Sequence, residues 1–245
     1  MYYYIMDSPK DSGQKREQEK IKDALGFLGI AGETVTVSPA RTIEELTNMG
    51  LAKKYSTIVA VGGDRLVNKI AAMLQEKDHV LGVIPVNASA EICNLIGTSD
   101  IKTACENLRF RKVKNVDLSY IEPNKYFLTN INIISNKPLN CQIEIDSCEF
   151  KATATNIVLE PNLTLHLQDE SLSGGTFKKA INWIFGKKSQ DNNTSIFKGK
   201  RIKIDTSESL PVLIDGEVIA KTPIVARVKP KVLKIIAGRD KMDLK

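Results

Sequence analysis

The tripeptide Gly62-Gly63-Asp64 has the residue types of a phosphate-binding turn. It follows a run of small and branched apolar residues at 57–61, typical of a buried strand, and precedes a helical apolar spacing at 66–74. A strand, a glycine turn and a helix in this order aim backbone N–H groups at an anion. The glycines allow close approach of the backbone, and the aspartate adds a carboxylate for a metal ion or a hydrogen bond. This segment is the first candidate for a site.

A second pair of carboxylates stands in Asp215-Gly216-Glu217, directly after the apolar run 212–214. Asp-Gly is a favoured two-residue turn of a β-hairpin, which would make the tripeptide structural. A carboxylate here could also act as a general base, if its neighbours orient it and shift its pKa upward. The tripeptide taken alone favours the hairpin.

In the first half of the chain, the strands and helices that must position these residues alternate. Strands are expected at 2–6, 33–37, 57–61 and 80–84, and helices at 15–28, 42–53 and 66–75. Thr42 and Glu45 have the spacing of a capping box at the start of the second helix. The alternation predicts a parallel sheet covered on both faces, with ligands outside the carboxyl ends of its strands. Residues 62–64 lie at one such end, and 7–9 and 85–87 at two others.

After about Asp117 the pattern changes to strands with a single helical segment at 176–186. The expected strands are 126–134, 139–145, 150–154, 156–160, 163–167, 201–204, 212–214, 224–228 and 232–236. Residues 187–194 are polar and turn-rich, as in a loop. The second half is therefore predicted to be a β-rich domain of antiparallel strands.

Composition narrows the class of protein. The 245 residues are 42% hydrophobic and 26% charged, as in an ordinary soluble globular protein, and the apolar runs fall well short of the roughly 20 residues that cross a bilayer. The four cysteines are irregularly spaced, which favours reduced thiols in a cytoplasmic protein over a zinc site. The net charge of +6 permits contact with anionic lipid, but there is no basic stripe with interleaved aromatics, so no nucleic-acid partner is expected.

Several segments, in order along the chain, resemble the diacylglycerol kinase and sphingosine kinase superfamily of lipid kinases. Gly62-Gly63-Asp64 with Val67-Asn68 is similar to its glycine-glycine-aspartate motif, and 8–13 to an altered Asn-Pro-x-Ser-Gly segment. Residues 81–85 match the strand before its second glycine loop. The domain crossover is matched by 111–118 and 126–130, and the Asp-Gly-Glu motif by 210–217, ahead of 228–230. NAD kinase shares the first motif, but the second loop here lacks the Asn-Glu pair of that family.

The resemblance implies an α/β fold in two domains. Residues 1–118 would form an N-terminal Rossmann-like parallel-sheet domain of the NAD kinase/diacylglycerol kinase type, which binds the nucleotide and to which the last strand, around 231–245, returns. Residues 119–230 would form a C-terminal antiparallel β-sandwich domain for the lipid substrate, with the active cleft between the two. The implied reaction is ATP- and Mg²⁺-dependent phosphoryl transfer to a lipid hydroxyl of diacylglycerol type.

The resemblance also carries roles to matching positions. Asp64 would hold the nucleotide or Mg²⁺, Asp215 would be the base for the lipid hydroxyl, and Glu217 would support it. The positions expected to bind the nucleotide are Ser8, Gly62, Gly63, Asp64, Arg65, Asn68, Asn87 and Ser89. With the whole ordered series in view, Asp215-Gly216-Glu217 is interpreted as a retained site position.

Three departures from the family pattern fall on nucleotide contacts. Where the family continues with Gly-Thr after its aspartate, this chain has Arg65 and Leu66. The second loop, 87–91, has lost both glycines and gained Glu91, and Ser8 replaces an asparagine. Loss of one preorganised donor costs about 3 kcal/mol in a transition state. Two functions therefore stay open: a lipid kinase of weak activity, and a catalytically inactive pseudokinase that binds lipid or nucleotide in the same cleft.

Arg65 and Lys69 are cations in the first turns of a helix, where they oppose the macrodipole by about 0.3–1 kcal/mol each. We hypothesise that Arg65 contacts a phosphate and replaces a lost backbone contact; the alternative is that both side chains reach into solvent.

The helical segment 176–186 has one apolar, partly aromatic face flanked by lysines through 188. Such a helix can lie on an anionic membrane or pack against the β-sandwich. The expected location is thus cytoplasmic with peripheral membrane contact through 176–188, and the expected partners are a small-molecule nucleotide and a membrane lipid. A homodimer is compatible with these features.

Overall fold

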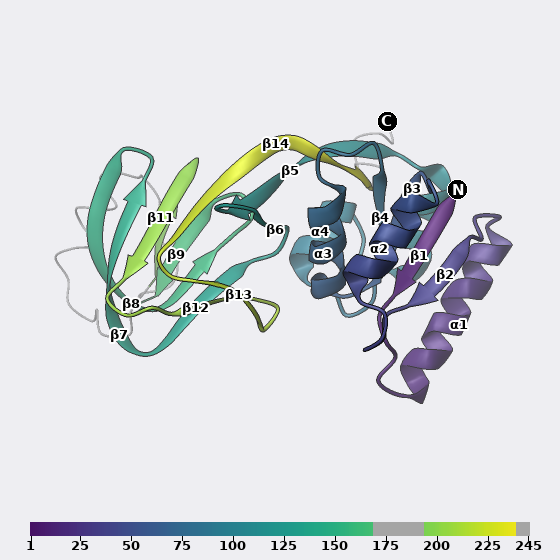
Figure 1. The fold of residues 1–245 in the computed structure, drawn as a ribbon, viewed down its shortest axis with the longest axis horizontal. Coiled ribbons are helices and arrows are strands. Elements are labelled where there is room, and N and C mark those ends of the chain that lie inside the picture. Colours follow the sequence, from purple (N-terminus) through teal and green to yellow (C-terminus); the bar gives the residue numbers. More distant parts are fainter. Residues whose placement is uncertain (169–193, 239–245) are drawn as a thin grey trace. The chain divides into compact units, whose positions relative to one another are not determined.

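The computed structural model describes residues 1–168 and 194–238, and the chain divides into two compact units (Figure 1). Unit 1 comprises Met1–Leu118 and Pro230–Lys245, and unit 2 comprises Ser119–Lys229. Two strands, β5 (Val113–Ile121) and β14 (Ile224–Ile236), contribute residues to both units. The helix predicted at 176–186, and with it the membrane contact predicted for 176–188, lies outside the described residues.

Unit 1 contains a parallel sheet in the order β14-β4-β3-β1-β2. Its strands are β1 (Tyr2–Met6), β2 (Glu33–Thr36), β3 (Thr57–Gly62) and β4 (Val80–Pro85). Every residue of β3 and β4 is buried, which explains their continuous apolar sequence. The predicted parallel α/β arrangement is confirmed.

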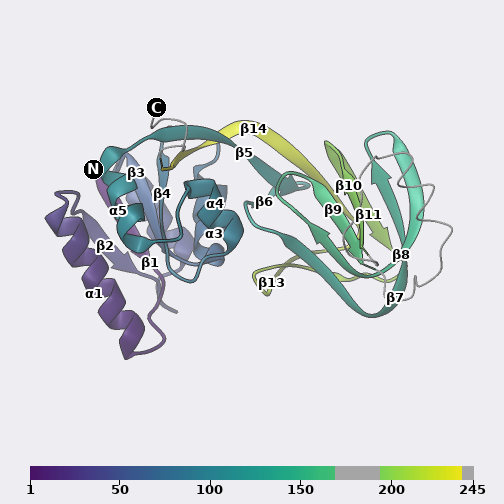
Figure 2. The same cartoon turned by 180° about the vertical axis from the view of Figure 1, so that it is seen from behind.

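Helices cover both faces of this sheet. They are α1 (Ser12–Phe27), α2 (Ile43–Ala52), α3 (Asp64–Leu74), α4 (Ala90–Ile96) and α5 (Ile101–Phe110). On one face, Leu25 of α1 and Leu108 of α5 share a buried cluster with Tyr4 and Val59 of the sheet. On the other face α2 packs against Tyr3 and Ile58, so closely that a Cβ on Gly50 would lie 2.7 Å from the Tyr3 ring. Figures 1 and 2 show these two faces in turn, with α2 nearer in the first and α5 nearer in the second.

Local signals account for most helix starts. The predicted capping box is present: Thr42 Oγ1 accepts the Glu45 N–H at 3.2 Å, and Glu45 Oε2 accepts the Thr42 N–H at 2.9 Å. The first helix begins at Ser12, three residues before its predicted start, because Asp11 caps it by accepting the Gln14 N–H at 2.8 Å. The third begins at Asp64, since Gly63 is its N-cap.

Unit 2 is built of antiparallel strands in the order β10-β9-β8-β7-β11-β14, with β12 pairing both β13 and β7. The strands are β6 (Lys125–Phe127), β7 (Ile131–Ile145), β8 (Cys148–Leu159), β9 (Thr164–Gln168), β10 (Thr194–Lys198), β11 (Arg201–Thr206), β12 (Pro211–Ile214) and β13 (Glu217–Lys221). Alternate residues, such as Ile143, Leu165, Ile202 and Ala226, form its buried core. The segments predicted at 139–145 and 126–134 are largely one strand, β7, whose pairing is irregular between Ile134 and Leu139.

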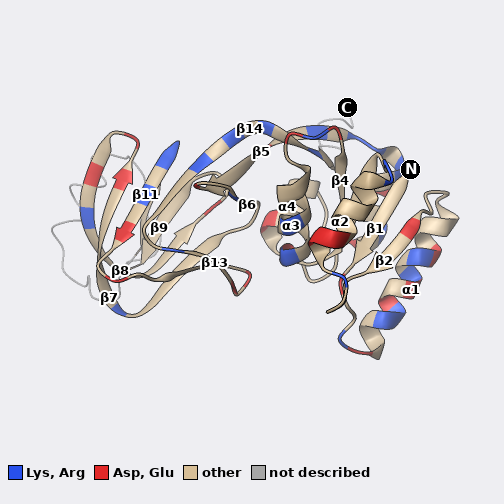
Figure 3. Cartoon of the chain, in the orientation of Figure 1, with Lys and Arg blue, Asp and Glu red and all other residues tan. Residues whose placement is uncertain are grey.

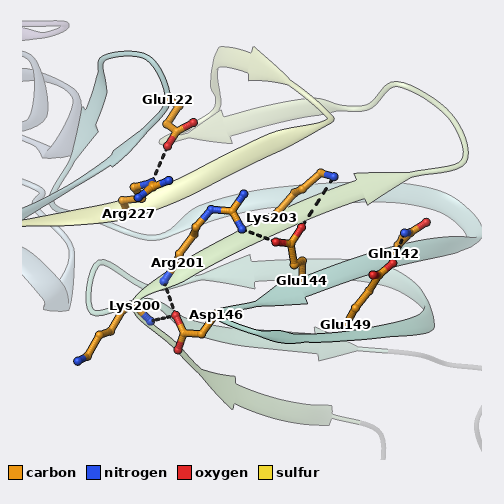
Figure 4. Close-up of polar contacts among 9 residues, drawn as sticks. All are labelled: Glu122, Gln142, Glu144, Asp146, Glu149, Lys200, Arg201, Lys203 and Arg227. Carbon is orange, nitrogen blue, oxygen red and sulfur yellow. Dashed lines mark hydrogen bonds and ion pairs between the residues drawn. The ribbon is translucent and has the colours of Figure 1, made fainter.

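The outer face of this sheet carries charges of both signs that are matched across strands (Figure 4). Arg201 of β11 lies directly opposite Arg227 of β14, a like-charge pair that is unfavourable by itself. Each arginine has its own carboxylate: Arg201 pairs with Glu144 at 2.5 Å, and Arg227 pairs with Glu122 at 2.5 Å. Lys203 lies 3.9 Å from the other oxygen of Glu144. These arginines are therefore neutralised by carboxylates of the same unit.

Charged residues of both signs also follow one another along α1 in unit 1 (Figure 3).

Among the described residues, none of the helices combines the length and the apolar character needed to span a membrane.

Candidate functional site

Three neighbouring strands of unit 1 end at the same edge of its sheet. β1 pairs with β3, and β3 with β4, all in parallel, with Met6 opposite Val61 and Gly62 opposite Pro85. The ladder continues one step past each strand: the Asp7 N–H donates to Val61 O, and the Val86 N–H donates to Gly62 O, both at 3.1 Å. The three segments expected at this edge, 7–9, 62–64 and 85–87, are thus brought together.

Asp7 is the residue that sequence reasoning assigned no role. Its Oδ2 accepts a hydrogen bond from the Gly63 N–H at 3.1 Å. A Cβ built on Gly62 would lie only 2.1 Å from the same oxygen. Gly62 is not in the left-handed region, so close approach of the carboxylate, and not backbone conformation, requires glycine there. The available signal was an acidic residue directly after a buried strand.

Asp64 connects the glycine turn to the second loop. It is the first residue of α3, where a carboxylate interacts favourably with the helix dipole. Its Oδ1 accepts the Ser89 N–H at 2.8 Å, and Ser89 in turn caps α4 by accepting the Ile92 N–H at 3.4 Å. Burial, followed by the negative charge of Asp64, raises the pKa of the Cys93 thiol. Asp64 and Ser89, expected to bind the nucleotide, therefore contact each other directly.

The other expected nucleotide-binding positions lie around this edge. Asn68 is buried one turn into α3, whereas Arg65 and Ser8 are exposed. Asn87 is also exposed and has a φ of 55°, the left-handed conformation that a glycine loop would adopt freely. Lys69 does not simply reach into solvent, since its Nζ lies 3.2 Å from Glu44 Oε1 of α2.

Asp215 and Glu217 belong to unit 2, on the hairpin that joins β12 to β13. Asp215 and Gly216 have φ values of 49° and 74°, both positive, as a two-residue hairpin turn of type I′ requires. Glu217 pairs with Ile214 across the turn. Asp215 and Gly216 thus form the two-residue hairpin turn that an Asp-Gly sequence favours, and the Asp215 side chain is exposed at its tip.

The carboxylates of this edge suit a metal ion that arrives with its ligand. Across residues 1–168 and 194–238, no three His, Cys, Asp or Glu side chains are grouped to hold a metal by themselves. Mg²⁺ is commonly held by one or two carboxylates together with substrate phosphates. Asp64 fits that mode of binding, in which the phosphates supply the remaining ligands.

Comparisons with known proteins agree with an α/β unit and a β-rich unit in one chain. Residues 7–121 match the family model of the diacylglycerol kinase catalytic domain, and residues 173–237 match that of the YegS C-terminal NAD kinase beta sandwich-like domain. A protein of Streptococcus pneumoniae serotype 4, named "Putative lipid kinase", is 22% identical over 242 residues, covering 90% of this chain and 82% of the relative. Two solved structures of a "putative diacylglycerol kinase" from Bacillus anthracis str. Sterne have TM-scores of 0.75 and 0.74 at 18% and 17% identity, covering 97% of both chains in each case.

The fold and the two domain matches define a protein with an α/β unit followed by an antiparallel β-sandwich of the NAD kinase and diacylglycerol kinase type. The two domain matches and the relatives named as putative lipid or diacylglycerol kinases agree with the resemblance to the diacylglycerol kinase and sphingosine kinase superfamily that the motifs indicate.

Proposed function

We propose that this protein transfers the γ-phosphoryl group of ATP to the hydroxyl of a diacylglycerol-type lipid. One observation carries the proposal. Within the segment that matches the diacylglycerol kinase catalytic domain, the Gly63 amide, the Ser89 amide and the Asp64 carboxylate meet at the carboxyl edge of the sheet. Backbone amides beside a carboxylate are the groups that a metal-bound phosphate chain needs.

On the nucleotide side, residues 1–118 with the final strand are assigned to ATP. The Gly63 and Ser89 amides would donate to phosphate oxygens, and Asp64 would share Mg²⁺ with the phosphates. Bound Mg²⁺ would neutralise charge that develops on the transferred group. Arg65, exposed in the first turn of α3, is assigned a direct phosphate contact that replaces a glycine of the family pattern.

On the acceptor side, residues 119–230 are assigned to the lipid. Asp215 would accept the proton of the attacking hydroxyl, and Glu217 would hold Asp215 in position. Exposure of Asp215 at the tip of a tight turn supports this role, because a base must be accessible to its substrate. The protein is assigned to the cytoplasm, with peripheral membrane contact through 176–188, where its substrate resides.

A specific observation favours a second candidate, a pseudokinase that binds lipid or nucleotide without turnover. Both amides that would hold phosphate already donate to carboxylates of the protein, Gly63 to Asp7 and Ser89 to Asp64. Together with the lost loop glycines, this arrangement weakens the preorganisation that phosphoryl transfer requires.

Calorimetry with ATP, with and without Mg²⁺, and transfer of labelled phosphate from ATP to diacylglycerol in mixed micelles separate the two candidates. We expect Mg²⁺-dependent binding and measurable transfer, with Asp215→Asn lowering kcat by about 10²-fold or more. Asp205→Asn, on β11 of the same unit, is the matched control and should retain the wild-type rate. Binding without transfer would select the pseudokinase, and absence of nucleotide binding under all conditions would refute the kinase.

A further inference from the structure

Asp7 emerges from a backbone that is fixed on both sides. Its N–H donates to Val61 O at 3.1 Å, and its carbonyl oxygen accepts a hydrogen bond from Gln18 Nε2 of α1 at 2.7 Å. The side chain therefore starts from a defined point beside the β3–α3 turn. Its position there is a property of the fold, since strand pairing and a helix both hold the main chain.

The carboxylate of Asp7 engages both glycines of the motif. Oδ2 accepts the Gly63 N–H, and the same oxygen fills the space where a Cβ of Gly62 would be, at 2.1 Å. A phosphate bound at a glycine turn uses the same two features: a backbone N–H that donates to it, and the space that the missing side chain leaves for close approach. An internal anion thus uses the groups that the proposed function assigns to a nucleotide.

The consequence for a ligand is electrostatic as well as steric. A phosphate oxygen can accept the Gly63 N–H only if the carboxylate moves aside or shares the donor, and two anions at such short range repel strongly where water is partly excluded. A divalent cation on the phosphates offsets that repulsion, whereas a metal-free nucleotide carries its full negative charge into the site.

We propose that Asp7 is a specificity-determining residue that competes with phosphate for the Gly63 amide and thereby makes nucleotide binding depend on a divalent cation. The inference rests on the nucleotide site of the proposed function. The proposal predicts the direction of the effect: removal of the charge at position 7 strengthens binding of metal-free nucleotide and reduces the difference in affinity between metal-free and metal-bound nucleotide.

The test compares ATP affinity in EDTA with ATP affinity in Mg²⁺ by calorimetry. Asp7→Asn keeps the size and an acceptor oxygen but removes the charge, and Asp7→Ala removes both. Asp23→Asn, an exposed position on α1 of the same unit, is the charge-matched control. We expect Asp7→Asn to bind metal-free ATP at least about tenfold more tightly than wild type, equivalent to about 1.4 kcal/mol. The affinity for Mg²⁺–ATP should change far less, and Asp23→Asn should match wild type in both conditions.

A second measurement uses the wild-type protein alone and so does not depend on how well any variant folds. In ¹⁵N-labelled wild type, the Gly63 amide signal should shift on addition of Mg²⁺–ATP but not on addition of the same concentration of ATP in EDTA. A Gly63 shift that is present and equally large in both conditions, or unchanged or weaker metal-free binding by Asp7→Asn, would overturn the proposal.

The same data separate this inference from the proposed function. If wild type fails to bind Mg²⁺–ATP while Asp7→Asn binds ATP, the kinase assignment falls and the competition stands. If wild type binds Mg²⁺–ATP and Asp7→Asn gains nothing in EDTA, the competition falls and the nucleotide site stands. If neither protein binds either form, both fall.

Discussion

Replacement of Gly62 by alanine tests whether the Asp7 carboxylate is fixed over the glycine turn. The added Cβ would lie 2.1 Å from Asp7 Oδ2 and 2.9 Å from Leu66 Cδ2, and real Cβ atoms essentially never approach within 3.0 Å of such atoms. The Leu66 methyl is the end of a flexible side chain and can give way. The carboxylate can give way only by losing its hydrogen bond to the Gly63 N–H.

The expected magnitude follows from these two contacts. Overpacking of a well-ordered site costs about 1–3 kcal/mol, and a hydrogen bond to a charged group contributes about 1.5–3 kcal/mol. Alanine also restricts the unfolded chain, which offsets about 0.4–1 kcal/mol, since the backbone at Gly62 is not in the left-handed region. Gly62→Ala should therefore lower the free energy of unfolding by about 1–3 kcal/mol in wild type. In an Asp7→Ala background the same change should be nearly neutral.

The assay is urea unfolding of wild type, both single variants and the double variant. It should be followed by the far-UV helical signal, because the five described helices all belong to unit 1. The cycle should give a coupling energy of about 1–3 kcal/mol between positions 7 and 62. Gly26→Ala is the matched control: no atom lies within 4 Å of its Cβ position on α1, so it should stabilise by about 0.5–1 kcal/mol and add independently to Asp7→Ala. An equal cost of Gly62→Ala in both backgrounds would refute the reasoning.

Three further outcomes follow from particular contacts. Thr42→Ala removes the capping box of α2 and should lower the free energy of unfolding by about 1 kcal/mol in urea titrations, and an unchanged value would contradict this. Hydrogen bonds from Lys53 and then a tyrosine hold the pKa of Glu33 below its usual value. The stability that ionised Glu33 contributes is therefore present above its pKa in the unfolded chain and is lost as pH falls through its pKa in the folded protein. The urea midpoints of wild type and Glu33→Gln should differ at neutral pH and converge in acid, and a constant difference would contradict this. Exposed Cys148 should react with a thiol-specific disulfide reagent well before Cys105, whose pKa is raised to about 11 mainly by burial, when modification is followed by peptide mapping; early labelling of Cys105 would count against its burial.

The parallel sheet could be predicted because each of its central strands is fully buried. A strand covered on both faces must be apolar at every position, so the strands predicted at 57–61 and 80–84 are recognisable without any knowledge of their neighbours; the structure extends each by one residue, to Gly62 and Pro85. The helices α4 and α5 were missed, although Ser89 and Asp100 are capping residues. These helices have 7 and 10 residues, so few turns are available from which a helical spacing of apolar residues can be recognised.

The contacts of the candidate site could not be predicted in the same way. Sequence indicates that 7–9 and 62–64 follow parallel strands, but the contact of Asp7 with Gly63 joins residues 56 positions apart. It depends on strand register and on the direction in which one side chain leaves the sheet edge, and neither is encoded in local spacing. The contact between Asp64 and Ser89 is equally non-local.

A glycine motif indicates that the backbone has space for an anion and an N–H that can donate to it. It does not indicate which anion binds there. At this turn a neutral asparagine at position 7 could also accept the Gly63 N–H, through a weaker hydrogen bond than the carboxylate forms, and it would need the same space beside Gly62. The contact with the Gly63 N–H and the space beside Gly62 therefore do not by themselves require a charge at position 7. Since a charge at this edge repels an anion that lacks a cation, the proposed role of Asp7 depends on its charge, and the Asp7→Asn variant separates that role from a structural one.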